Sequence, residues 1–459
     1  MPDWLTWKVL VLGFAVWIIA ISVTIILQRR SATATIAWIL ALSFLPIIGW
    51  LVYRLIGPQR LHRRKLRRKL GRVAVENATG AMTKIRQGQA EDVGVAMVPM
   101  VMTEAPPLSA TDVQLYVDGA SKYKALLEAV AAAQHHIHIE YYIWEPDKIG
   151  VMLRDALIER ARAGVIVRML VDGTGSSGLR EAFLRPLRDA GVEVAWFNPI
   201  KLRFIRTMRR PDFRTHRKIV ICDGNVGFTG GMNITDKHSA DLYPRYWRDT
   251  HVRIDGPAVW PMQRVFIEDW VFATGAAPPT GAAYFPPPAG PDRYVAQIVA
   301  SGPDQDFLAI HRTFFAAITR ANKRVWVTTP YFVPDDATMT ALVTAANRQV
   351  DVRIIIPEHG DSRLVDYAAR SYLPDLLAAG VTVYEYLPRF IHAKTLVIDD
   401  DVAIVGTANL DNRSFQLNFE IAALVYGTEF NQKLAAQFEL DQADARAVTA
   451  EVLTRVGWR

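Results

Sequence analysis

The chain has 459 residues, of which 51% are hydrophobic and 22% charged, so it has enough apolar surface for a packed core and is not a disordered chain. Its 53 lysines and arginines exceed its 46 aspartates and glutamates, and the resulting formal charge of +7 favours anionic partners such as acidic lipid or nucleic acid. The single cysteine, Cys222, excludes an internal disulfide framework and a cysteine-built zinc site.

Two long apolar stretches open the chain. No charged residue occurs from Val9 to Leu27, and as a helix this stretch is long enough to cross the hydrocarbon core of a bilayer. A second uncharged stretch runs from Ser31 to Tyr53, and lipid-embedded helices tolerate the Pro46 and Gly49 within it. Residues 1–56 are therefore predicted to form a two-helix transmembrane hairpin, with spans at about 9–27 and 31–53. A cleaved signal peptide or a buried soluble hairpin explains two such stretches less well.

Basic residues are concentrated after the second stretch. Only Arg29 and Arg30 lie between the two stretches, whereas Arg54 and a dense run from Arg60 to Arg72 follow them. By the positive-inside rule, everything after the second span is predicted to be cytoplasmic. The run would also suit a solvated helix face or a nucleic-acid patch, but its position beside a span favours anionic lipid headgroups. We interpret residues 57–110 as a basic juxtamembrane collar and a connector.

The rest of the chain contains an internal repeat. HHIHIEYYIWEPD at His135–Asp147 matches KRVWVTTPYFVPDD at Lys323–Asp336, and the same order of helix, strand, helix and strand follows each segment. We predict an α/β fold of two repeated α/β/α halves, each with a mostly parallel sheet, which together form one pseudo-twofold catalytic unit. The segment Gly275–Pro291, rich in proline and glycine, separates them. The first half is therefore assigned to residues 111–285 and the second to residues 286–459.

Each half then contains one pattern, His-x-Lys-(x)4-Asp-(x)6-Gly-[Gly/Thr]-x-Asn, without a spacing error. The residues that match it are His216, Lys218, Asp223 and Asn233 in the first half, and His392, Lys394, Asp399 and Asn409 in the second. The residues after each histidine favour a strand, so the histidine and the lysine project from one face into one pocket. Imidazole can act as a nucleophile or as an acid and base near neutral pH, and lysine offers charge and donors to a phosphate. The repeated pattern predicts a two-histidine phosphoryl-transfer site at the pseudo-twofold interface rather than two buried core histidines.

The remaining residues of the pattern are given separate tasks. Asn233 and Asn409 are expected to donate hydrogen bonds to non-bridging phosphate oxygens. Asp223 and Asp399 complete the predicted catalytic sets. Their opposite strand parity and their position at the strand ends nevertheless favour bracing of the turn or of the lysine over contact with substrate.

A carboxylate follows each asparagine at matching positions of the repeat, Asp249 in the first half and Glu420 in the second. A catalytic imidazole needs its second ring nitrogen hydrogen-bonded, usually to a carboxylate. We therefore predict that Asp249 and Glu420 orient the two histidines, with surface carboxylates as the alternative. Three clustered histidines, His135, His136 and His138, lack a second set of metal ligands and are interpreted as strand-surface residues.

The paired motifs resemble the HKD motifs of the phospholipase D superfamily over about residues 110–443, although Gly231 stands where the family often has serine. The amino-terminal hairpin, the basic collar, TPYFVPDD at Thr329–Asp336 and NLDNRSFQLNFE at Asn409–Glu420 further resemble the bacterial cardiolipin synthases of that superfamily. The resemblance implies transfer of a phosphatidyl group from one phosphatidylglycerol to another with release of glycerol, through a phosphatidyl-histidine at His216 and without a metal or other cofactor. It also implies a bacterial inner-membrane protein, catalytic on its cytoplasmic side, whose partners are phosphatidylglycerol and anionic lipid rather than nucleic acid.

Three other functions are compatible with parts of this pattern. Hydrolysis, with water as acceptor and phosphatidic acid as product, differs only in how the pocket excludes water. A nuclease would use the same phosphodiester chemistry, but two membrane spans argue against it, and a non-catalytic membrane scaffold would have little use for two intact motifs. The basic segment Lys201–Arg214 is extra in the first half, and we expect it to capture headgroups or to form a membrane-facing lid, with a solvated loop as the alternative.

Overall fold

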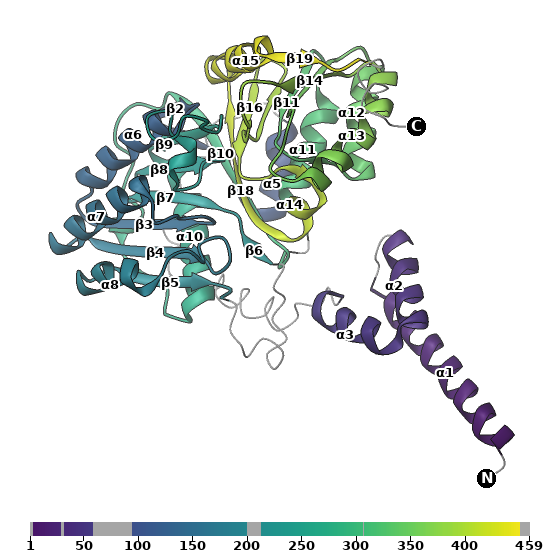
Figure 1. Ribbon diagram of the computed structural model, residues 1–459. Coiled ribbons are helices and arrows are strands. Elements are labelled where there is room, and N and C mark those ends of the chain that lie inside the picture. Colours follow the sequence, from purple (N-terminus) through teal and green to yellow (C-terminus); the bar gives the residue numbers. More distant parts are fainter. Residues whose placement is uncertain (1–2, 29–31, 58–93, 200–212, 306, 450–459) are drawn as a thin grey trace. The chain divides into compact units, whose positions relative to one another are not determined.

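The computed structural model describes residues 3–28, 32–57, 94–199, 213–305 and 307–449 (Figure 1). These residues belong to two units, which are described separately: the first contains the helices before residue 58, and the second contains the described residues from 94 onward. All the predicted site residues lie in the second unit. The basic run from Arg60 to Arg72 and most of the Lys201–Arg214 segment lie outside the described residues.

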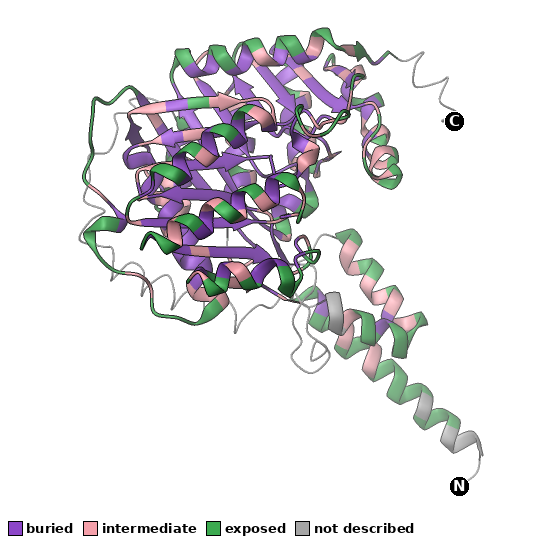
Figure 2. Ribbon diagram, turned by 60° about the vertical axis from the view of Figure 1, so that its left-hand side comes forward, coloured by how far each residue is buried: buried purple, intermediate pink, exposed green. Residues whose placement is uncertain are grey.

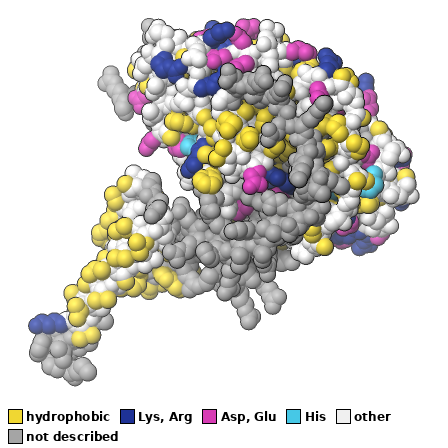
Figure 3. Space-filling view, turned by 180° about the vertical axis from the view of Figure 1, so that it is seen from behind, with side chains coloured by type: hydrophobic (Ala, Val, Ile, Leu, Met, Phe, Trp, Pro, Cys, Tyr) yellow, Lys and Arg dark blue, Asp and Glu magenta, His cyan; other side chains and the backbone are white. Residues whose placement is uncertain are grey.

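The first unit consists of the helices α1 (Asp3–Ile26), α2 (Ala32–Phe44) and α3 (Pro46–Ile56). Within α1, Trp7–Ile26 is long and apolar enough to cross a membrane, and in the described part of the chain it is the helix that meets both criteria. Most of its side chains are exposed, and Figure 3 shows hydrophobic side chains along the surface of this unit. A helix of this composition is expected to lie in lipid rather than in water.

The second predicted span, residues 31–53, is divided in the structure. Leu45 has φ −126° and ψ 65°, outside the helical region, and α3 begins again at Pro46, a residue suited to the first turn of a helix. With 13 residues, α2 is about 20 Å long, which is shorter than the roughly 30 Å hydrocarbon core of a bilayer. This stretch is thus two helices joined at Leu45 and not the single helix that the sequence predicted.

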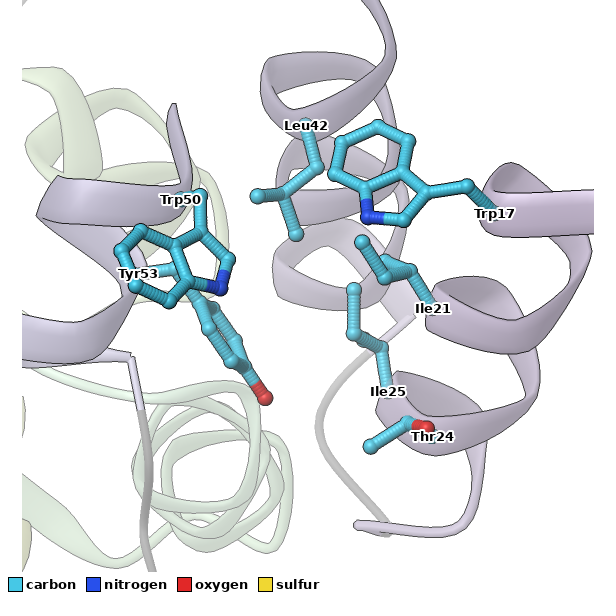
Figure 4. Close-up of a pocket in the computed structure, with 7 residues that line it drawn as sticks. All are labelled: Trp17, Ile21, Thr24, Ile25, Leu42, Trp50 and Tyr53. Carbon is cyan, nitrogen blue, oxygen red and sulfur yellow. The ribbon is translucent and has the colours of Figure 1, made fainter. Parts of the chain in front are cut away.

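The three helices line a partly open, mostly apolar pocket of about 280 Å³ (Figure 4). Its lining comes from all three helices and consists of Trp17, Ile21, Thr24, Ile25, Leu42, Trp50 and Tyr53. The Tyr53 hydroxyl also accepts a hydrogen bond from Gln28 Nε2 at 2.6 Å. Aromatic and aliphatic side chains of all three helices therefore face one pocket, and the Gln28–Tyr53 hydrogen bond links the end of the first helix region to α3.

The first repeated half is built on a seven-stranded sheet. Its strands, in spatial order, are β2 (Asp112–Tyr116), β9 (His251–Asp255), β8 (Val226–Gly230), β7 (Lys218–Cys222), β3 (His136–Tyr141), β4 (Ile166–Asp172) and β5 (Glu193–Phe197). One face is covered by α6 (Gly119–Ala132), α7 (Lys148–Arg162) and α8 (Glu181–Asp189), and the other by α10 (Trp260–Thr274). Figure 2 shows the result, with buried strands between helices whose outer faces are exposed.

The second half repeats this plan on a ten-stranded sheet. Its main path is β1 (Leu108–Ala110), β10 (Tyr294–Ser301), β18 (Asn418–Tyr426), β16 (Val402–Gly406), β15 (Thr395–Ile398), β11 (Arg324–Thr328), β13 (Asp351–Pro357), β14 (Thr382–Tyr386) and β19 (Ala445–Ala447). The helices α5 (Gly94–Thr103), α11 (Ala309–Arg320), α12 (Asp336–Asn347) and α13 (Arg363–Ala378) cover one face, and α15 (Thr428–Ala443) covers the other. A short parallel pair, β12 (Phe332–Val333) with β17 (Leu410–Asp411), and the helix α14 (Asn412–Gln416) complete this half.

Both sheets are mixed, which corrects the expectation of mostly parallel sheets. Within the main paths of the two sheets, parallel pairing links β3, β4 and β5 in the first half and β11, β13 and β14 in the second. The motif strands pair antiparallel, β7 with β8 and β15 with β16. Each of these pairs is joined by a tight turn at Asp223 or Asp399, and a connection that short can only return the chain in the opposite direction.

The repeated Pro-Asp pairs start helices in both halves. The Asp147 carboxylate accepts a hydrogen bond from the Gly150 N–H at 3.1 Å at the start of α7, and Asp335 accepts one from the Thr338 N–H at 2.9 Å at the start of α12. A side-chain oxygen at this position satisfies a backbone donor that the first turn of a helix otherwise leaves unpaired. The repeat seen in the sequence therefore includes the signal that ends the first strand region and begins the next helix.

Two of the three clustered histidines lie inside the first half and not on its surface, while His135 is partly exposed. His136 and His138 are fully buried on the α10 face of β3, where Gln263 lies 3.2 Å from a ring nitrogen of each. Tyr284, which comes from the proline-rich segment between the halves, packs against both rings. Burial lowers the pKa of His136 to about 4. For His136 and His138 the strand-surface interpretation was wrong, because α10 and the linker cover this face of the sheet.

The cap at α12 can be tested by substitution. Asp335→Ala is expected to lower the free energy of unfolding by about 1 kcal/mol, because the Thr338 N–H loses its partner. Chemical denaturation of the purified protein measures this, with the exposed Glu439→Ala on α15 as the matched control. Equal stability of the two variants would show that the cap contributes nothing.

Candidate active site

The two motif histidines are held by main-chain contacts with the opposite half. The short strand β6 (Arg214–Thr215) pairs in parallel with β18 of the second half, and the His216 N–H donates to the Phe419 carbonyl oxygen at 2.8 Å. In the other direction, the His392 N–H donates to the Arg248 carbonyl oxygen at 2.6 Å. Each histidine therefore lies beside the strand region of the other half that carries the predicted orienting carboxylate.

The imidazole rings contact those carboxylates directly. His216 Nδ1 lies 3.0 Å from Glu420 Oε2, and His392 Nδ1 lies 2.7 Å from Asp249 Oδ2. Both carboxylates are fully buried. Because a carboxylate only accepts hydrogen bonds, each contact places the proton on Nδ1 and leaves Nε2 of the ring for chemistry. The structure thus pairs each histidine with the carboxylate of the other half, a partner that the sequence did not identify.

Two buried arginines fasten the halves beside these contacts. Arg217 forms an ion pair with Asp269 of the first half and donates from Nε to the Glu420 carbonyl oxygen at 3.2 Å. Arg248 of the first half pairs with Asp441 of the second, with N–O distances of 2.6 and 2.9 Å. The Arg248–Asp441 ion pair and the Arg217 hydrogen bond to Glu420 cross between the halves, and because both ion pairs are buried, removing one partner of either would leave an uncompensated charge.

The environment of Glu420 favours the charged form. Thr407 Oγ1 donates to Oε2 at 2.5 Å, and Asn418 Nδ2 donates to Oε1 at 3.0 Å. Burial opposes the charge, but His216 and Lys218 together with the Thr407 hydroxyl hold the pKa of Glu420 below its ordinary value. Glu420 is therefore an ionised acceptor for the Nδ1 proton of His216.

Asp249 has a different set of neighbours. Its Oδ1 accepts a hydrogen bond from the Thr250 N–H at 2.7 Å, and burial raises its pKa against the opposing effect of Lys394. The residue that corresponds to Thr407 in the repeat is Gly231, and a Cβ there would lie 2.0 Å from Asp249 Oδ1. The glycine that departs from the family pattern is therefore required by the position of this carboxylate.

Both motif lysines are buried beside the histidines. Lys218 Nζ donates to the His216 carbonyl oxygen at 2.8 Å, and Lys394 Nζ donates to the His392 carbonyl oxygen at 2.5 Å. Burial lowers the pKa of Lys218 to about 7 and that of Lys394 to about 8, and the charge of Lys394 also lowers that of Lys218. An anion bound between the lysines would favour their charged forms, so the site is suited to a phosphodiester.

The motif aspartates lie at the far ends of the same strands. Asp223 accepts hydrogen bonds from the N–H groups of three consecutive residues at the start of β3, at 2.8, 2.8 and 2.9 Å. Asp399 does the same at the start of β11, and both aspartates have positive φ, 53° and 45°. At about 3.3 Å per residue, a whole strand separates each from its motif histidine. Their hydrogen bonds brace the turns, which is the expected alternative to substrate contact, and the assignment of Asp223 and Asp399 to the catalytic sets stays a prediction.

The two asparagines occupy equivalent buried positions. Asn233 Oδ1 accepts a hydrogen bond from the Ile143 N–H at 3.3 Å, while Asn409 Oδ1 is buried without a hydrogen-bond partner among the described residues. Their main-chain N–H groups donate to side chains five residues further on, to His238 Nε2 in the first half and to Ser414 Oγ in the second, each at 3.2 Å. These are the loops that follow β8 and β16, so the repeat brings both asparagines to the same end of the sheets as the histidines.

Aromatic residues that the sequence did not single out surround the histidines. The Tyr142 ring packs edge-on against His216 at 5.1 Å, with Lys218 Nζ 5.6 Å from its centre. Trp247 and Phe390 lie against His392 at 5.4 and 5.7 Å. Aromatic residues are common in any core, so no spacing signal marked these in the sequence. They limit the access of water to the reacting groups.

A possible set of metal ligands also lies here. Ligand atoms of His238, Asp249 and His392 are within 4.8 Å of one another. Among the described residues, this is the group of three histidine, cysteine or acidic side chains that lie close enough together to bind one metal ion. The charge of Lys394 acts on His238 and Asp249 and opposes a divalent cation. The arrangement fits a hydrogen-bonded chain of groups better than a metal centre.

Comparison with known families gives two matches. Residues 126–270 and 314–442 match the family described as "Cardiolipin synthase, PLD-like domain", which includes the motif of each half. Residues 15–58 match the family described as "Phospholipase_D-nuclease N-terminal".

Individual proteins are similar over almost the whole chain. The chain is 39% identical to cardiolipin synthase 1 of Bacillus anthracis, over 93% of this chain and 86% of that protein. It is 39% identical to the cardiolipin synthase of Geobacillus thermodenitrificans, over 92% and 85%. Among solved structures, the phosphatidylserine synthase of Haemophilus influenzae matches with a TM-score of 0.58 and 15% identity, over 78% of this chain and 92% of that one. The structural match shows a shared fold.

The contact between Gly231 and Asp249 generates a prediction. Gly231→Ala is expected to lower kcat for a chromogenic phosphodiester by at least about tenfold, because the added Cβ must displace the carboxylate that contacts His392. Gly94→Ala is the control, since a Cβ there meets nothing within 4 Å. Full turnover by a folded Gly231→Ala variant would show that the position of Asp249 does not matter.

Proposed function

The chain belongs to the cardiolipin synthases of the phospholipase D superfamily, and from this premise we propose that it transfers a phosphatidyl group from one phosphatidylglycerol to a hydroxyl of another, giving cardiolipin and releasing glycerol. The observation that carries the proposal is the pair of crossed histidine–carboxylate contacts beside two buried lysines. Two oriented imidazoles supply a nucleophile and an acid, and the lysines supply charge for one phosphodiester.

The reaction proceeds in two steps. In the first, His216 Nε2 attacks phosphorus, the bond from phosphorus to the glycerol oxygen breaks, and His392 donates its proton to that oxygen. In the second, His392 removes the proton from a hydroxyl of the incoming phosphatidylglycerol, whose oxygen attacks phosphorus and displaces His216. Both histidines and all protons return to their starting state, so one glycerol is released for each cardiolipin formed.

Substrate charge sets the protonation states that these steps need. In the empty site, burial and the charges of Lys394 and Lys218 hold the pKa of His392 well below its ordinary value. A bound phosphodiester anion offsets the two lysine charges and so raises the proton affinity of His392. The lysines, with Asn233 and Asn409 as amide donors, then stabilise the additional negative charge on the pentavalent phosphorus centre. Asp249 and Glu420 hold the rings in place.

The membrane arrangement follows from the first unit and the basic run. The helix α1 is proposed to cross the bacterial inner membrane, and α2 and α3 are proposed to lead the chain back through the same membrane. The residues from Arg60 to Arg72 are then proposed to lie at anionic headgroups on the cytoplasmic side, where about 1 kcal/mol per basic residue favours contact. The halves 111–285 and 286–459 would act on the lipids of that leaflet.

Product analysis with defined lipids tests the proposal. The full-length protein is incubated with phosphatidylglycerol vesicles and EDTA, and the products are identified by mass spectrometry. We expect cardiolipin and glycerol in equal amounts, unaffected by EDTA because lysines provide the phosphate-binding charge. His216→Ala and His392→Ala are each expected to lower turnover by at least about a thousandfold.

His359→Ala serves as the matched control, because this histidine is 83% exposed and takes no part in the site. Phosphatidic acid as the sole lipid product would contradict the proposal in favour of hydrolysis. Loss of activity with EDTA that one divalent ion restores would contradict the metal-free mechanism.

A further inference from the structure

A third histidine, His238, lies behind the carboxylate that contacts His392. It ends the short 3-10 helix Asp236–His238, after Asn233, and its side chain is fully buried. Its Nε2 accepts a hydrogen bond from the Asn233 N–H at 3.2 Å. A neutral imidazole that accepts at one nitrogen carries its proton on the other, so this contact places the proton of His238 on Nδ1.

That Nδ1 proton faces Asp249. The distance from His238 Nδ1 to Asp249 Oδ2 is 3.6 Å, and Nδ1 has no hydrogen-bond partner among the described residues. The same carboxylate oxygen accepts from His392 Nδ1 at 2.7 Å. Asp249 therefore lies between two imidazoles, of which one is presented to the substrate and the other is enclosed in the protein. A movement of a few tenths of an ångström would complete the outer hydrogen bond.

Trp247 holds the two imidazoles in this relation. Its ring meets His238 edge-on at 5.4 Å and lies against His392 at 5.4 Å. The rings of the two histidines are 5.8 Å apart. Because all three rings are packed, His238 has little freedom to turn its Nδ1 away from Asp249.

The second half shows what His238 replaces. There, Ser414 Oγ accepts the equivalent main-chain N–H from Asn409, and the carboxylate Glu420 receives its extra donors from Thr407 and Asn418. In the first half the position of Thr407 is taken by Gly231, which has no hydroxyl to give. Without His238, Asp249 would lack a side-chain donor other than His392 among the residues that the structure describes.

We propose that His238 is a positioning residue of the reaction, which presents its Nδ1 proton to Asp249 and thereby keeps that carboxylate charged and turned toward His392. The inference rests on the proposed phosphatidyl transfer, in which His392 is the acid and then the base. The titratable groups that act on His238 are Asp249, His392, Lys122 from α6 and Lys394 beside β15, and His238 in turn acts on the buried His251 of β9. Burial lowers the pKa of His238 well below its ordinary value, so it acts as a neutral donor and not as a charge.

Removal of the His238 donor is expected to change the pKa of His392 in one direction. Without the donor, Asp249 holds its charge less well and stabilises the protonated form of His392 less. The pKa of His392 then falls, so the protonated acid is lost at a lower pH and the descending limb of the kcat profile moves to lower pH. Because His238 does not touch the substrate, KM is expected to stay within about twofold while kcat falls by about tenfold or more.

The experiment compares full-length variants. His238→Phe removes both ring nitrogens, and His238→Asn keeps a donor near the position of Nδ1. Ser414→Ala is the matched control, since it removes the corresponding main-chain acceptor in the second half and, although its hydroxyl also contacts the Asp411 carboxylate, it is not a donor to Glu420 or Asp249. The pH profile of kcat is measured for phosphatidyl transfer, and the pKa of His392 is followed by NMR on protein labelled at histidine, with His392→Ala to assign its signal.

We expect the descending limb and the pKa of His392 to move to lower pH in His238→Phe, to return toward the wild-type position in His238→Asn, and to stay in place in Ser414→Ala. If the role of His238 is purely structural, His238→Phe and Ser414→Ala will both be less stable, while the pKa of His392 and the descending limb of the kcat profile stay in place. That result would overturn the inference. The NMR reading does not depend on the substrate. A wild-type protein that makes no cardiolipin would therefore contradict the proposed function, while an unmoved His392 pKa in both His238 variants would contradict the role of His238.

Discussion

The crossed contact between each motif histidine and the carboxylate of the other half is the constraint on which the site depends. His216 is fixed to the second half through its main-chain N–H and its ring, and His392 is fixed to the first half in the same way. Neither half alone contains a histidine with its orienting carboxylate. The repeated domains must therefore be packed in register before any catalytic group is complete, and the buried Arg248–Asp441 pair and the Arg217 hydrogen bond to the Glu420 carbonyl oxygen join the halves in that register.

The same constraint places a high density of charge in a closed space. Two carboxylates and two lysines are buried within one centre, and burial lowers the pKa of Lys218 and Lys394 toward neutrality. An anionic substrate compensates the lysines, so binding of a phosphodiester and proton uptake by the site are coupled. The two buried carboxylates have different neighbours: Glu420 accepts a hydrogen bond from the hydroxyl of Thr407, and Asp249 faces the imidazole of His238. The two halves therefore differ in the groups that surround the carboxylates of the catalytic histidines, although their motifs are the same.

The sequence was informative where the signal is local. The spacing of His216 to Lys218 and of His392 to Lys394 predicted a shared pocket because alternate strand residues face one side. The Asp-Gly turn after Cys222 also signals a tight hairpin, and the mixed sheet follows from it, but the order of strands and helices was interpreted as mostly parallel. His136 and His138 were placed on a surface because nothing in their spacing reveals that α10 and Tyr284 cover that face. The choice of carboxylate for each histidine depends on how two separate sheets pack, which chain order does not contain.

The central claim is the crossed pairing, and the most direct measurement is the rate of covalent adduct formation in two carboxylate variants. A phosphatidyl ester with a good leaving group needs little protonation, so its single-turnover rate reports only the attacking histidine and its carboxylate. With His216 as nucleophile, Glu420→Gln is expected to slow labelling of the peptide that contains His216 by at least about tenfold, while Asp249→Asn leaves it within about twofold. The opposite result, with labelling at His216 slowed by Asp249→Asn and unchanged in Glu420→Gln, would pair each histidine with the carboxylate of its own half and contradict the account.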